Sequence, residues 1–314
     1  MKTKTLHANP NGIEEAARRL QAGELVAFPT ETVYGLGADA CNDQAVASIY
    51  EAKGRPSFNP LIVHFANIEA VKRQVSWNDW AEKLSVAFWP GALTFILPRA
   101  EDCELSLLVS AGLGTVAVRV PAHDIAHQLI KAATTPIAAP SANTSGKISP
   151  TTAAHVSASL GGKISTILDG GTCTIGLEST VVDLSGSAPA FLRPGGITHD
   201  EIVGVIGPLA DAGRDDTIKS PGMLARHYAP EVAIRLNATS FTDSENVLGF
   251  GPDAPAGALN LSPTGDLVDA AANLFALLHK LDQPGGKSIA VMPIPETGLG
   301  IAINDRLRRA ATRE

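Results

Sequence analysis

Apolar and polar residues alternate along the first two thirds of this chain in two distinct periods. Short apolar runs, bounded by Gly, Pro or polar residues, predict buried β-strands. Between these runs, apolar residues recur every three or four positions, which predicts amphipathic helices. The expected strands cover residues 24–28, 61–65, 92–97, 115–120, 137–139, 165–168, 180–184 and 190–192.

The expected helices begin and end at residues with known capping preferences. Asn11 is the candidate N-cap of the first helix, and Gly23 ends it. Asn42 takes the same place in the second helix, which ends at Gly54. The expected helices cover residues 11–23, 42–54, 67–75, 79–88, 123–133, 151–160 and 198–205.

Strands that alternate with helices predict an α/β fold, and hairpin-like strands after residue 164 indicate a mixed sheet. We expect a first domain over residues 1–207, a linker rich in Gly and Pro over 208–230, and a smaller α/β domain over 231–314. Residues 288–292 of the small domain are predicted to form a strand. Its helix carries one apolar stripe, made of Leu267, Val268, Ala271, Leu274, Leu278 and Leu281.

The composition narrows the class of protein. The chain has 314 residues, of which 45% are hydrophobic and 18% charged, enough for a well-buried core. A net charge of −7 disfavours a surface that binds nucleic acid as a whole, although a local basic patch stays possible. The three cysteines lie far apart and suggest reduced structural thiols. Because no signal-peptide pattern or membrane-spanning apolar run is present, we expect a cytoplasmic protein.

Several short motifs resemble functional signatures but lack the required context. The sequence GKS at 286–288 ends like a phosphate-binding loop, but Leu281 stands where that motif needs glycine. The GxGxxA pattern at 112–117 runs into a predicted strand instead of opening a helix. His123 and His127 have the spacing of metalloprotease ligands, but neither the glutamate nor a third ligand is present. We interpret them as surface histidines.

Four arginines cluster near the C-terminus on a predicted helix. We interpret them as a solvated helix face, and a weak contact with RNA is the less favoured alternative. They are Arg306, Arg308, Arg309 and Arg313.

Two polar loops are expected to meet at one edge of the sheet. Residues 29–37 follow one predicted strand and residues 53–60 precede another, and the helix between them returns the chain to the same edge. Lys53 and Arg55 lie just past this helix, where they either neutralise a polyphosphate or cap the helix C-terminus. The geometry suits a site for anionic small molecules.

Further polar residues interrupt or follow the apolar runs. Arg119 lies within a strand, and a buried arginine needs a carboxylate partner, supplied either by the protein or by a ligand. His64 ends a strand and alone suggests a satisfied core histidine. Ser141 and Asn143 follow a strand, where such residues bind anions or cap a helix. The other candidates are Asn59, Ser149, Ser179, Arg193 and Tyr228.

Several segments together resemble the YrdC-like threonylcarbamoyl-AMP synthases, in particular their longer two-domain form. In chain order they are FPTETVYGLG, KGRP with NPLIVH, WPGALTFIL, VAVRVP, PIAAPSANTSG, ILDGG, GLESTVVD, LRPGG, SPGM with HYAP, and GLGIAINDRLRRAA. The resemblance covers nearly the full chain. Each block alone is weak evidence, whereas the ordered set is specific.

The resemblance implies a nucleotidyltransferase that joins L-threonine, bicarbonate or CO2, and ATP into threonylcarbamoyl-AMP and releases pyrophosphate. A downstream transferase would then move the threonylcarbamoyl group to an adenosine of tRNA. The resemblance also implies a mixed, twisted sheet around a concave cavity, a linker across its mouth, and a Rossmann-like C-terminal domain. Mg2+ would accompany ATP, with phosphate and water as most of its ligands.

Family positions carried onto this chain assign two binding regions. The threonine region comprises Thr32, His64, Arg119, Ala139 and Ser179. The ATP region comprises Lys53, Arg55, Asn59, Thr115, Ser141, Asn143, Ser149, Arg193 and Tyr228. Lys53 and Arg55 are expected to stabilise charge during catalysis, and Arg119 to pair the threonine carboxylate bidentately.

Two other classes of function compete with this hypothesis. A carbamoyl-transfer domain of a hydrogenase maturation protein would belong to a much larger chain without this C-terminal domain. An RNA-binding module without catalysis finds little support in a net charge of −7.

Overall fold

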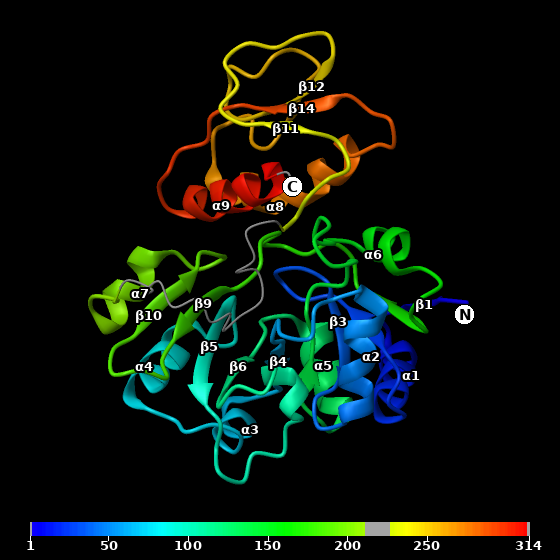
Figure 1. Cartoon of the computed structure of the whole chain (residues 1–314), viewed down its shortest axis with the longest axis vertical. Helices are drawn as coiled ribbons and strands as arrows, with labels where there is room; N and C mark the ends of the chain where they lie inside the picture. The colour runs from blue at the N-terminus through cyan, green and yellow to red at the C-terminus, as the bar shows by residue number, and fades with distance from the viewer. Residues whose placement is uncertain (1, 211–226, 313–314) are drawn as a thin grey trace.

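The computed structural model describes residues 2–210 and 227–312. It shows a large domain built around one long sheet and a small domain at the C-terminal end of the chain (Figure 1). Residues 211–226, which make up most of the expected linker, lie outside the described residues. None of the described helices is long and apolar enough to cross a membrane.

The large domain contains a sheet in which ten strands lie in the order β1-β8-β2-β3-β7-β4-β6-β5-β9-β10. Neighbouring strands pair both in parallel, as β4 does with β6, and antiparallel, as β2 does with β3. The sheet is therefore mixed, as the sequence predicts. The strands are β1 (Lys4–His7), β2 (Val26–Phe28), β3 (Gly35–Asp39), β4 (Ile62–His64), β5 (Leu93–Pro98), β6 (Thr115–Arg119), β7 (Ile137–Ala138), β8 (Thr166–Asp169), β9 (Thr180–Asp183) and β10 (Ala190–Arg193).

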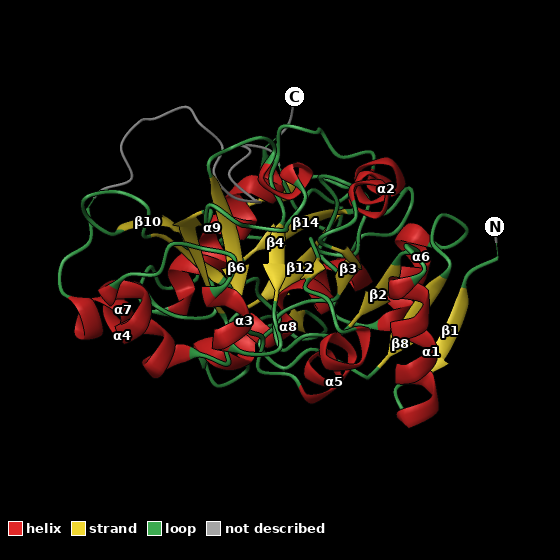
Figure 2. Cartoon of the chain, turned by 90° about the horizontal axis from the view of Figure 1, so that it is seen from below, coloured by secondary structure: helices red, strands yellow, loops and turns green. Residues whose placement is uncertain are grey.

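Helices cover both faces of this sheet. Along β2, Val26 and Phe28 pack in one apolar cluster with α1 and α5, whereas Ala27 packs in another with α2. This alternation follows from side chains that point to opposite faces along a strand, and Figure 2 shows α2 on one side of these strands and α1 and α5 on the other. The helices are α1 (Pro10–Gln21), α2 (Asp43–Lys53), α3 (Ile68–Lys72), α4 (Asp79–Phe88), the 3-10 helix η1 (Leu107–Ser110), α5 (Asp124–Ala133), α6 (Ala153–Leu160) and α7 (His199–Ile206).

The start of α1 differs from the prediction. Asn9, not Asn11, is the N-cap, and its side chain accepts a hydrogen bond from the backbone N–H of Gly12. Pro10 occupies the first helical position, where its missing N–H costs nothing and its fixed φ suits the helix. The helix therefore begins two residues earlier than its apolar pattern suggests.

The polar segment predicted as a turn at 29–37 contains the beginning of a strand. Gly35–Asp39 forms β3, which pairs antiparallel with β2. A Cβ atom on Gly37 would lie 2.9 Å from both the Phe28 ring and the Ile137 side chain, so only glycine fits between them. Glycine weakens strand propensity, which is why the sequence pattern conceals this strand.

The small domain is a parallel four-stranded sheet packed on two helices. The strand order is β11-β14-β12-β13. In Figure 1, α8 and α9 lie between this sheet and the large domain. The elements are β11 (Ile234–Arg235), β12 (Glu245–Gly249), β13 (Leu259–Asn260), α8 (Leu267–Leu281), β14 (Ser288–Val291) and α9 (Leu299–Ala311).

The apolar stripe predicted for α8 is wrong at one position. Val268 is 64% exposed, because the first turn of α8, capped by Asp266, projects toward solvent. Phe275 is buried and belongs to the stripe instead. The residues of α8 that pack in the core of the small domain are Ala270, Ala271, Leu274, Phe275, Leu278 and Leu281.

Candidate active site

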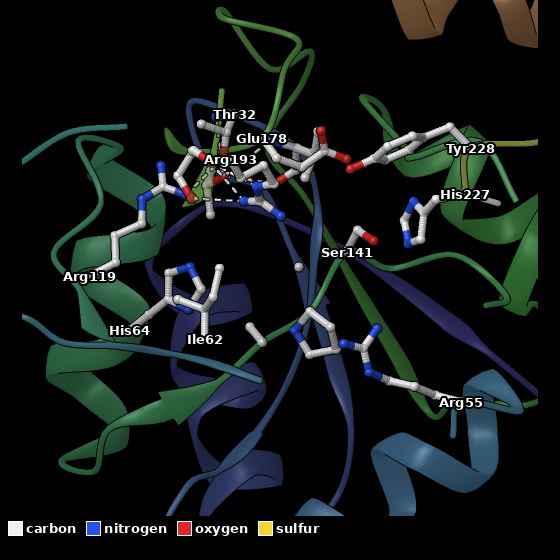
Figure 3. Close-up of a pocket in the computed structure, with 16 residues that line it drawn as sticks. Thr32, Arg55, Ile62, His64, Arg119, Ser141, Glu178, Arg193, His227 and Tyr228 are labelled. Carbon is white, nitrogen blue, oxygen red and sulfur yellow. Dashed lines mark hydrogen bonds between the residues drawn. The ribbon is translucent and has the colours of Figure 1, made fainter. Parts of the chain in front are cut away.

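A small cavity that opens to solvent lies where several strands of the large sheet end. Figure 3 shows Arg119 and His64 on one side of it and Arg55, His227 and Tyr228 on the opposite side. The cavity is lined by Thr30, Thr32, Val33, Gly35, Arg55, Ile62, His64, Arg119, Ala139, Pro140, Ser141, Glu178, Ser179, Arg193, His227 and Tyr228.

The structure brings most of the predicted site residues to this cavity. Those on its wall are Thr32, Arg55, His64, Arg119, Ala139, Ser141, Ser179, Arg193 and Tyr228. Lys53, Asn59, Thr115, Asn143 and Ser149 are not among its lining residues. The glutamates Glu31 and Glu178 take part in the site although the sequence did not single them out.

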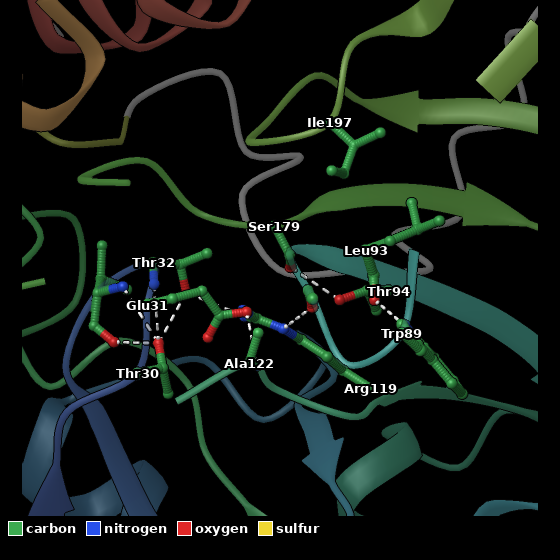
Figure 4. A network of polar contacts seen from close by, with 12 residues as sticks. Thr30, Glu31, Thr32, Trp89, Leu93, Thr94, Arg119, Ala122, Ser179 and Ile197 are labelled. Carbon is green, nitrogen blue, oxygen red and sulfur yellow. Dashed lines mark hydrogen bonds and ion pairs between the residues drawn. The ribbon is translucent and has the colours of Figure 1, made fainter. Parts of the chain in front are cut away.

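Arg119 has a carboxylate partner within the protein, which is the first of the two alternatives that the sequence left open. Its Nη2 lies 2.6 Å from Oε1 of Glu31, and its Nη1 donates to Oγ1 of Thr32 at 2.9 Å (Figure 4). Its Nε donates to the carbonyl of Gly91 at 3.0 Å. A guanidinium has five N–H groups, so two remain for another acceptor. Arg119 is thereby held in one orientation at the cavity wall.

Glu31 is an anion in this buried network. Burial raises the pKa of its carboxyl, but the charge of Arg119 and a hydrogen bond from the backbone N–H of Ala122 keep that pKa below its usual value. Its Oε2 has no hydrogen-bond partner among the described residues. The sequence alone did not identify this role; the one signal it offered was an acidic residue in an otherwise apolar and hydroxyl-rich segment.

His64 is neutral at physiological pH. Burial, followed by the nearby charge of Arg119, lowers its pKa to about 3. Its Nδ1 has no partner among the described residues, although the ring lines the cavity. A buried polar atom without a partner is unusual in a folded protein and is explained by a ligand or water. His64 therefore acts as a hydrogen-bonding group rather than as a charged one.

Lys53 and Arg55 do not cap the end of α2, because Gly54 in the left-handed conformation does so through its backbone N–H. Lys53 is 1% exposed and its Nζ donates to the backbone carbonyls of Ser141 and Asn143. Lys53 thus fixes the loop that follows β7 from behind, and burial together with Arg55 lowers its pKa.

Arg55 reaches the cavity itself. Its Nε and Nη2 donate to the carbonyls of Asn59 and Pro60 at 3.2 and 2.9 Å, and burial is the main cause that lowers its pKa to about 10. The amide atoms Oδ1 and Nδ2 of Asn59, Oδ1 of Asn143 and Nδ1 of His227 are buried without partners among the described residues. This region therefore offers a cation with several unused donors and acceptors, as a polar ligand requires.

The wall between the two sides is built by residues at the start of β9. Arg193 donates from Nη2 to the backbone carbonyl of Ser179 at 2.7 Å, and the hydroxyls of Ser179 and Thr94 lie 2.7 Å apart. Glu178 accepts a hydrogen bond from Oγ of Ser149 at 2.6 Å. This contact is what connects Ser149, which does not line the cavity, to the cavity wall.

The solvated-face interpretation of the C-terminal arginines is wrong for Arg306. This side chain is fully buried, and its Nε donates to Oε2 of Glu178 at 2.9 Å, because α9 presents it to the large domain. Arg308 is 54% exposed and pairs with Glu296, as a surface residue does. Arg313 lies outside the described residues.

Comparison with known proteins identifies the family. Residues 18–195 match the Sua5/YciO/YrdC family, described as telomere recombination, and residues 197–312 match a domain described as threonylcarbamoyl-AMP synthase, C-terminal domain. The chain belongs to the Sua5/YciO/YrdC family. Its relatives include a Pyrococcus abyssi protein named threonylcarbamoyl-AMP synthase, 44% identical over 95% of this chain and 94% of that protein. A Bacillus subtilis protein of the same name is 44% identical over 98% of this chain and 95% of its own.

Some members of the Sua5/YciO/YrdC family are shorter. A Mycobacterium tuberculosis protein named putative threonylcarbamoyl-AMP synthase is 39% identical over 62% of this chain, and the match fills 89% of that protein. The chain described here has the two-domain form.

Solved structures agree with this membership. The crystal structure of P. abyssi Sua5 complexed with L-threonine has a TM-score of 0.91 and 41% identity, and the match covers 98% of each chain. A structure of HypF shares the fold alone, with a TM-score of 0.53 and 22% identity, and the match covers 29% of that chain. The predicted α/β fold with a second, smaller domain is therefore confirmed for this family member.

Proposed function

We propose that this chain is an L-threonylcarbamoyladenylate synthase, which condenses L-threonine, bicarbonate or CO2, and ATP to threonylcarbamoyl-AMP and pyrophosphate. The observation that carries the proposal is one cavity with a buried arginine at each side, Arg119 and Arg55. Such a cavity can bind the carboxylate of an amino acid and a polyphosphate next to each other. Its full-length relatives are named for this activity, and the P. abyssi Sua5 structure contains L-threonine.

The threonine side of the cavity would comprise Thr32, His64, Arg119, Ala139 and Ser179. The two N–H groups that Arg119 does not use for Glu31, Thr32 and Gly91 would bind the threonine carboxylate. Because Glu31 already balances the charge of Arg119, recognition would rest on the direction of these N–H groups as much as on charge.

The nucleotide side would comprise Lys53, Arg55, Asn59, Thr115, Ser141, Asn143, Ser149, Arg193 and Tyr228. Arg55 and Arg193 line the cavity and would neutralise the phosphates. Lys53 would act indirectly. Its ammonium group donates to the carbonyls of Ser141 and Asn143 and so shapes the loop that would face the nucleotide. The unpartnered amide of Asn59 and the unpartnered Oδ1 of Asn143 support a polar ligand at this side.

The reaction needs positioning more than a nucleophilic side chain. The neutral amine of threonine attacks CO2, and the amine loses one proton to give a carbamate. A carbamate oxygen then attacks the α-phosphorus of ATP, and the bond to the pyrophosphate breaks. Two anions meet in this second step, so the arginines at the nucleotide side lower the barrier by offsetting their repulsion.

ATP would enter as its Mg2+ complex. No group of three or more His, Cys, Asp or Glu side chains in residues 2–210 and 227–312 is arranged to hold a metal ion, and Glu178 is engaged by Arg306 and Ser149. Phosphate oxygens and water would therefore supply the ligands. The product would pass to a downstream transferase for tRNA threonylcarbamoyladenosine formation in the cytoplasm.

Incubation of the purified chain with threonine, bicarbonate, Mg2+ and ATP tests this proposal. We expect pyrophosphate release that depends on both threonine and bicarbonate. Mass spectrometry of the quenched reaction should detect threonylcarbamoyl-AMP. Turnover that does not depend on threonine would refute the proposal, and RNA binding without turnover would favour a binding module instead.

A further inference from the structure

Arg306 extends from the small domain into the large domain. It lies on α9 and is fully buried, and its guanidinium makes contacts in both domains. Nε donates to Oε2 of Glu178 at 2.9 Å, and Nη1 donates to the carbonyl of Pro194 at 2.7 Å. Nη1 also donates to Oδ2 of Asp305 at 2.8 Å, on its own helix. Burial of a charged arginine destabilises the fold unless a specific partner compensates for the lost hydration of the guanidinium.

That partner, Glu178, lines the proposed active-site cavity. Both of its carboxylate oxygens are occupied, Oε1 by the hydroxyl of Ser149 and Oε2 by Arg306. Burial raises the pKa of Glu178, but the charges of Arg306 and then Arg193 keep it below the usual value, so the side chain is an anion. An anion therefore lies in the wall of a cavity that is proposed to bind a triphosphate.

Arg306 also contacts the chain where it re-enters the described structure. Its guanidinium carbon lies 5.4 Å from the centre of the Tyr228 ring, within the range of a cation–π contact. The same ring packs against Phe275 of α8 with a centroid distance of 5.5 Å. Tyr228 has a φ of +63°, a conformation that is unfavourable for a residue other than glycine and that the surrounding structure has to stabilise.

From these contacts we infer that Arg306 is a positioning residue for the nucleotide side of the cavity. This inference rests on the proposed function. Arg306 neutralises Glu178, fixes its carboxylate so that Ser149 is oriented, and holds Tyr228 at the cavity wall. The small domain thereby supplies part of the active site without touching the substrate.

The charge of Glu178 determines the effect of losing Arg306. Without Arg306, Glu178 is a buried carboxylate that has lost its largest compensating charge, and it repels the triphosphate and competes with it for Arg193. Removal of one member of a buried ion pair is more harmful than removal of both. Neutralising Glu178 as well should therefore recover nucleotide binding, which a merely structural role of Arg306 does not predict.

The test compares four variants of the full chain in the pyrophosphate-release assay: Arg306→Met, Glu178→Gln, the combination of both, and Arg308→Met. Arg308 is the matched control, because it lies on the same helix in an exposed ion pair with Glu296. We expect Arg306→Met to raise the KM for ATP at least about tenfold, equivalent to about 1.4 kcal/mol, with the KM for threonine within about twofold of the parent. The combination should recover most of this loss, and Arg308→Met should behave as the parent chain.

Equal rises in both KM values, with no recovery in the combination, would overturn the inference and leave Arg306 a structural residue. If the parent chain releases no threonine-dependent pyrophosphate, the proposed function fails instead, and the same four proteins are then compared by calorimetric titration with Mg-ATP alone. If Arg306→Met does not fold, Arg306→Lys takes its place, since the ammonium keeps the charge but not the several contacts. An ATP affinity of Arg306→Lys equal to that of the parent would count against the inference.

Discussion

Replacement of Arg119 by lysine tests the threonine side of the cavity most directly. The guanidinium spans three protein acceptors at once, namely Glu31, Thr32 and the carbonyl of Gly91, at 2.6, 2.9 and 3.0 Å. A lysine ammonium keeps the positive charge, so Glu31 is not left as an unpaired anion. It cannot, however, reach three divergent acceptors and also present two parallel N–H groups to a ligand carboxylate.

The expected magnitude follows from the hydrogen bonds that are lost. A hydrogen bond to a charged group contributes about 1.5–3 kcal/mol, and about 1.4 kcal/mol corresponds to a factor of ten. Loss of one such bond to threonine therefore predicts a rise in the KM for threonine of roughly ten- to a hundredfold. The KM for ATP should stay within about twofold, because Arg55 lies at the other side of the cavity (Figure 3).

Steady-state pyrophosphate release at saturating ATP and bicarbonate, with threonine varied, measures this effect. Arg18→Lys is the matched control, because Arg18 forms an exposed ion pair with Glu15 on α1. An unchanged KM for threonine in Arg119→Lys would refute the assignment. A rise confined to the KM for ATP would also contradict the assignment, because it would place Arg119 at the nucleotide side of the cavity.

Three further results are expected. The pKa of Glu31 in the folded chain lies below its ordinary value of 4.5, so its ion pair stabilises the fold above about pH 4.5. This contribution is lost as the pH falls through the folded pKa. In urea unfolding, Glu31→Gln should therefore be less stable than the parent at pH 7, with a smaller difference at pH 3.5. The pKa of His64 is about 3 in the folded chain and 6.5 in the unfolded chain. The parent chain is therefore expected to lose stability as the pH falls from 6.5 toward 3, because the unfolded chain then binds a proton that the folded chain does not. His64→Gln should show a flatter dependence of the free energy of unfolding on pH. Lys53→Met removes the donor to the carbonyls of Ser141 and Asn143, which holds the loop after β7, so the KM for ATP should rise by about tenfold or more. Lys131→Met, on the exposed side of α5, should leave the KM for ATP unchanged.

Much of the fold follows from local patterns, and the exceptions have physical causes. A strand such as β2 is a continuous apolar run because both faces of the sheet are covered. By contrast, the apolar pattern does not predict β1, since its residues 4–7 are mostly polar and exposed at the edge of the sheet. The short strands β11 and β13 have two residues each and give no periodic signal.

The site shows a similar division between local and tertiary information. Motifs single out Arg55, Arg119 and Ser141, and the structure brings all three to one cavity, because each lies at or near the end of a predicted strand or helix. Which carboxylate meets Arg119 could not be deduced, since Glu31 is 88 residues away in the chain. Arg306 meets Glu178 across 128 residues, and neither a helix pattern nor the net charge contains that pairing.

The ion pair between Glu178 and Arg306 also has an evolutionary consequence. The match to the M. tuberculosis protein covers 89% of that protein but only 62% of this chain. That protein is therefore too short to contain a complete second domain. Without α9, a glutamate at the position of Glu178 would lose its largest compensating charge. Loss or gain of the second domain should therefore coincide with a change at this one position, to a neutral residue in the short proteins and to glutamate in the long ones. The second domain and the residue at the position of Glu178 are therefore expected to change together in evolution.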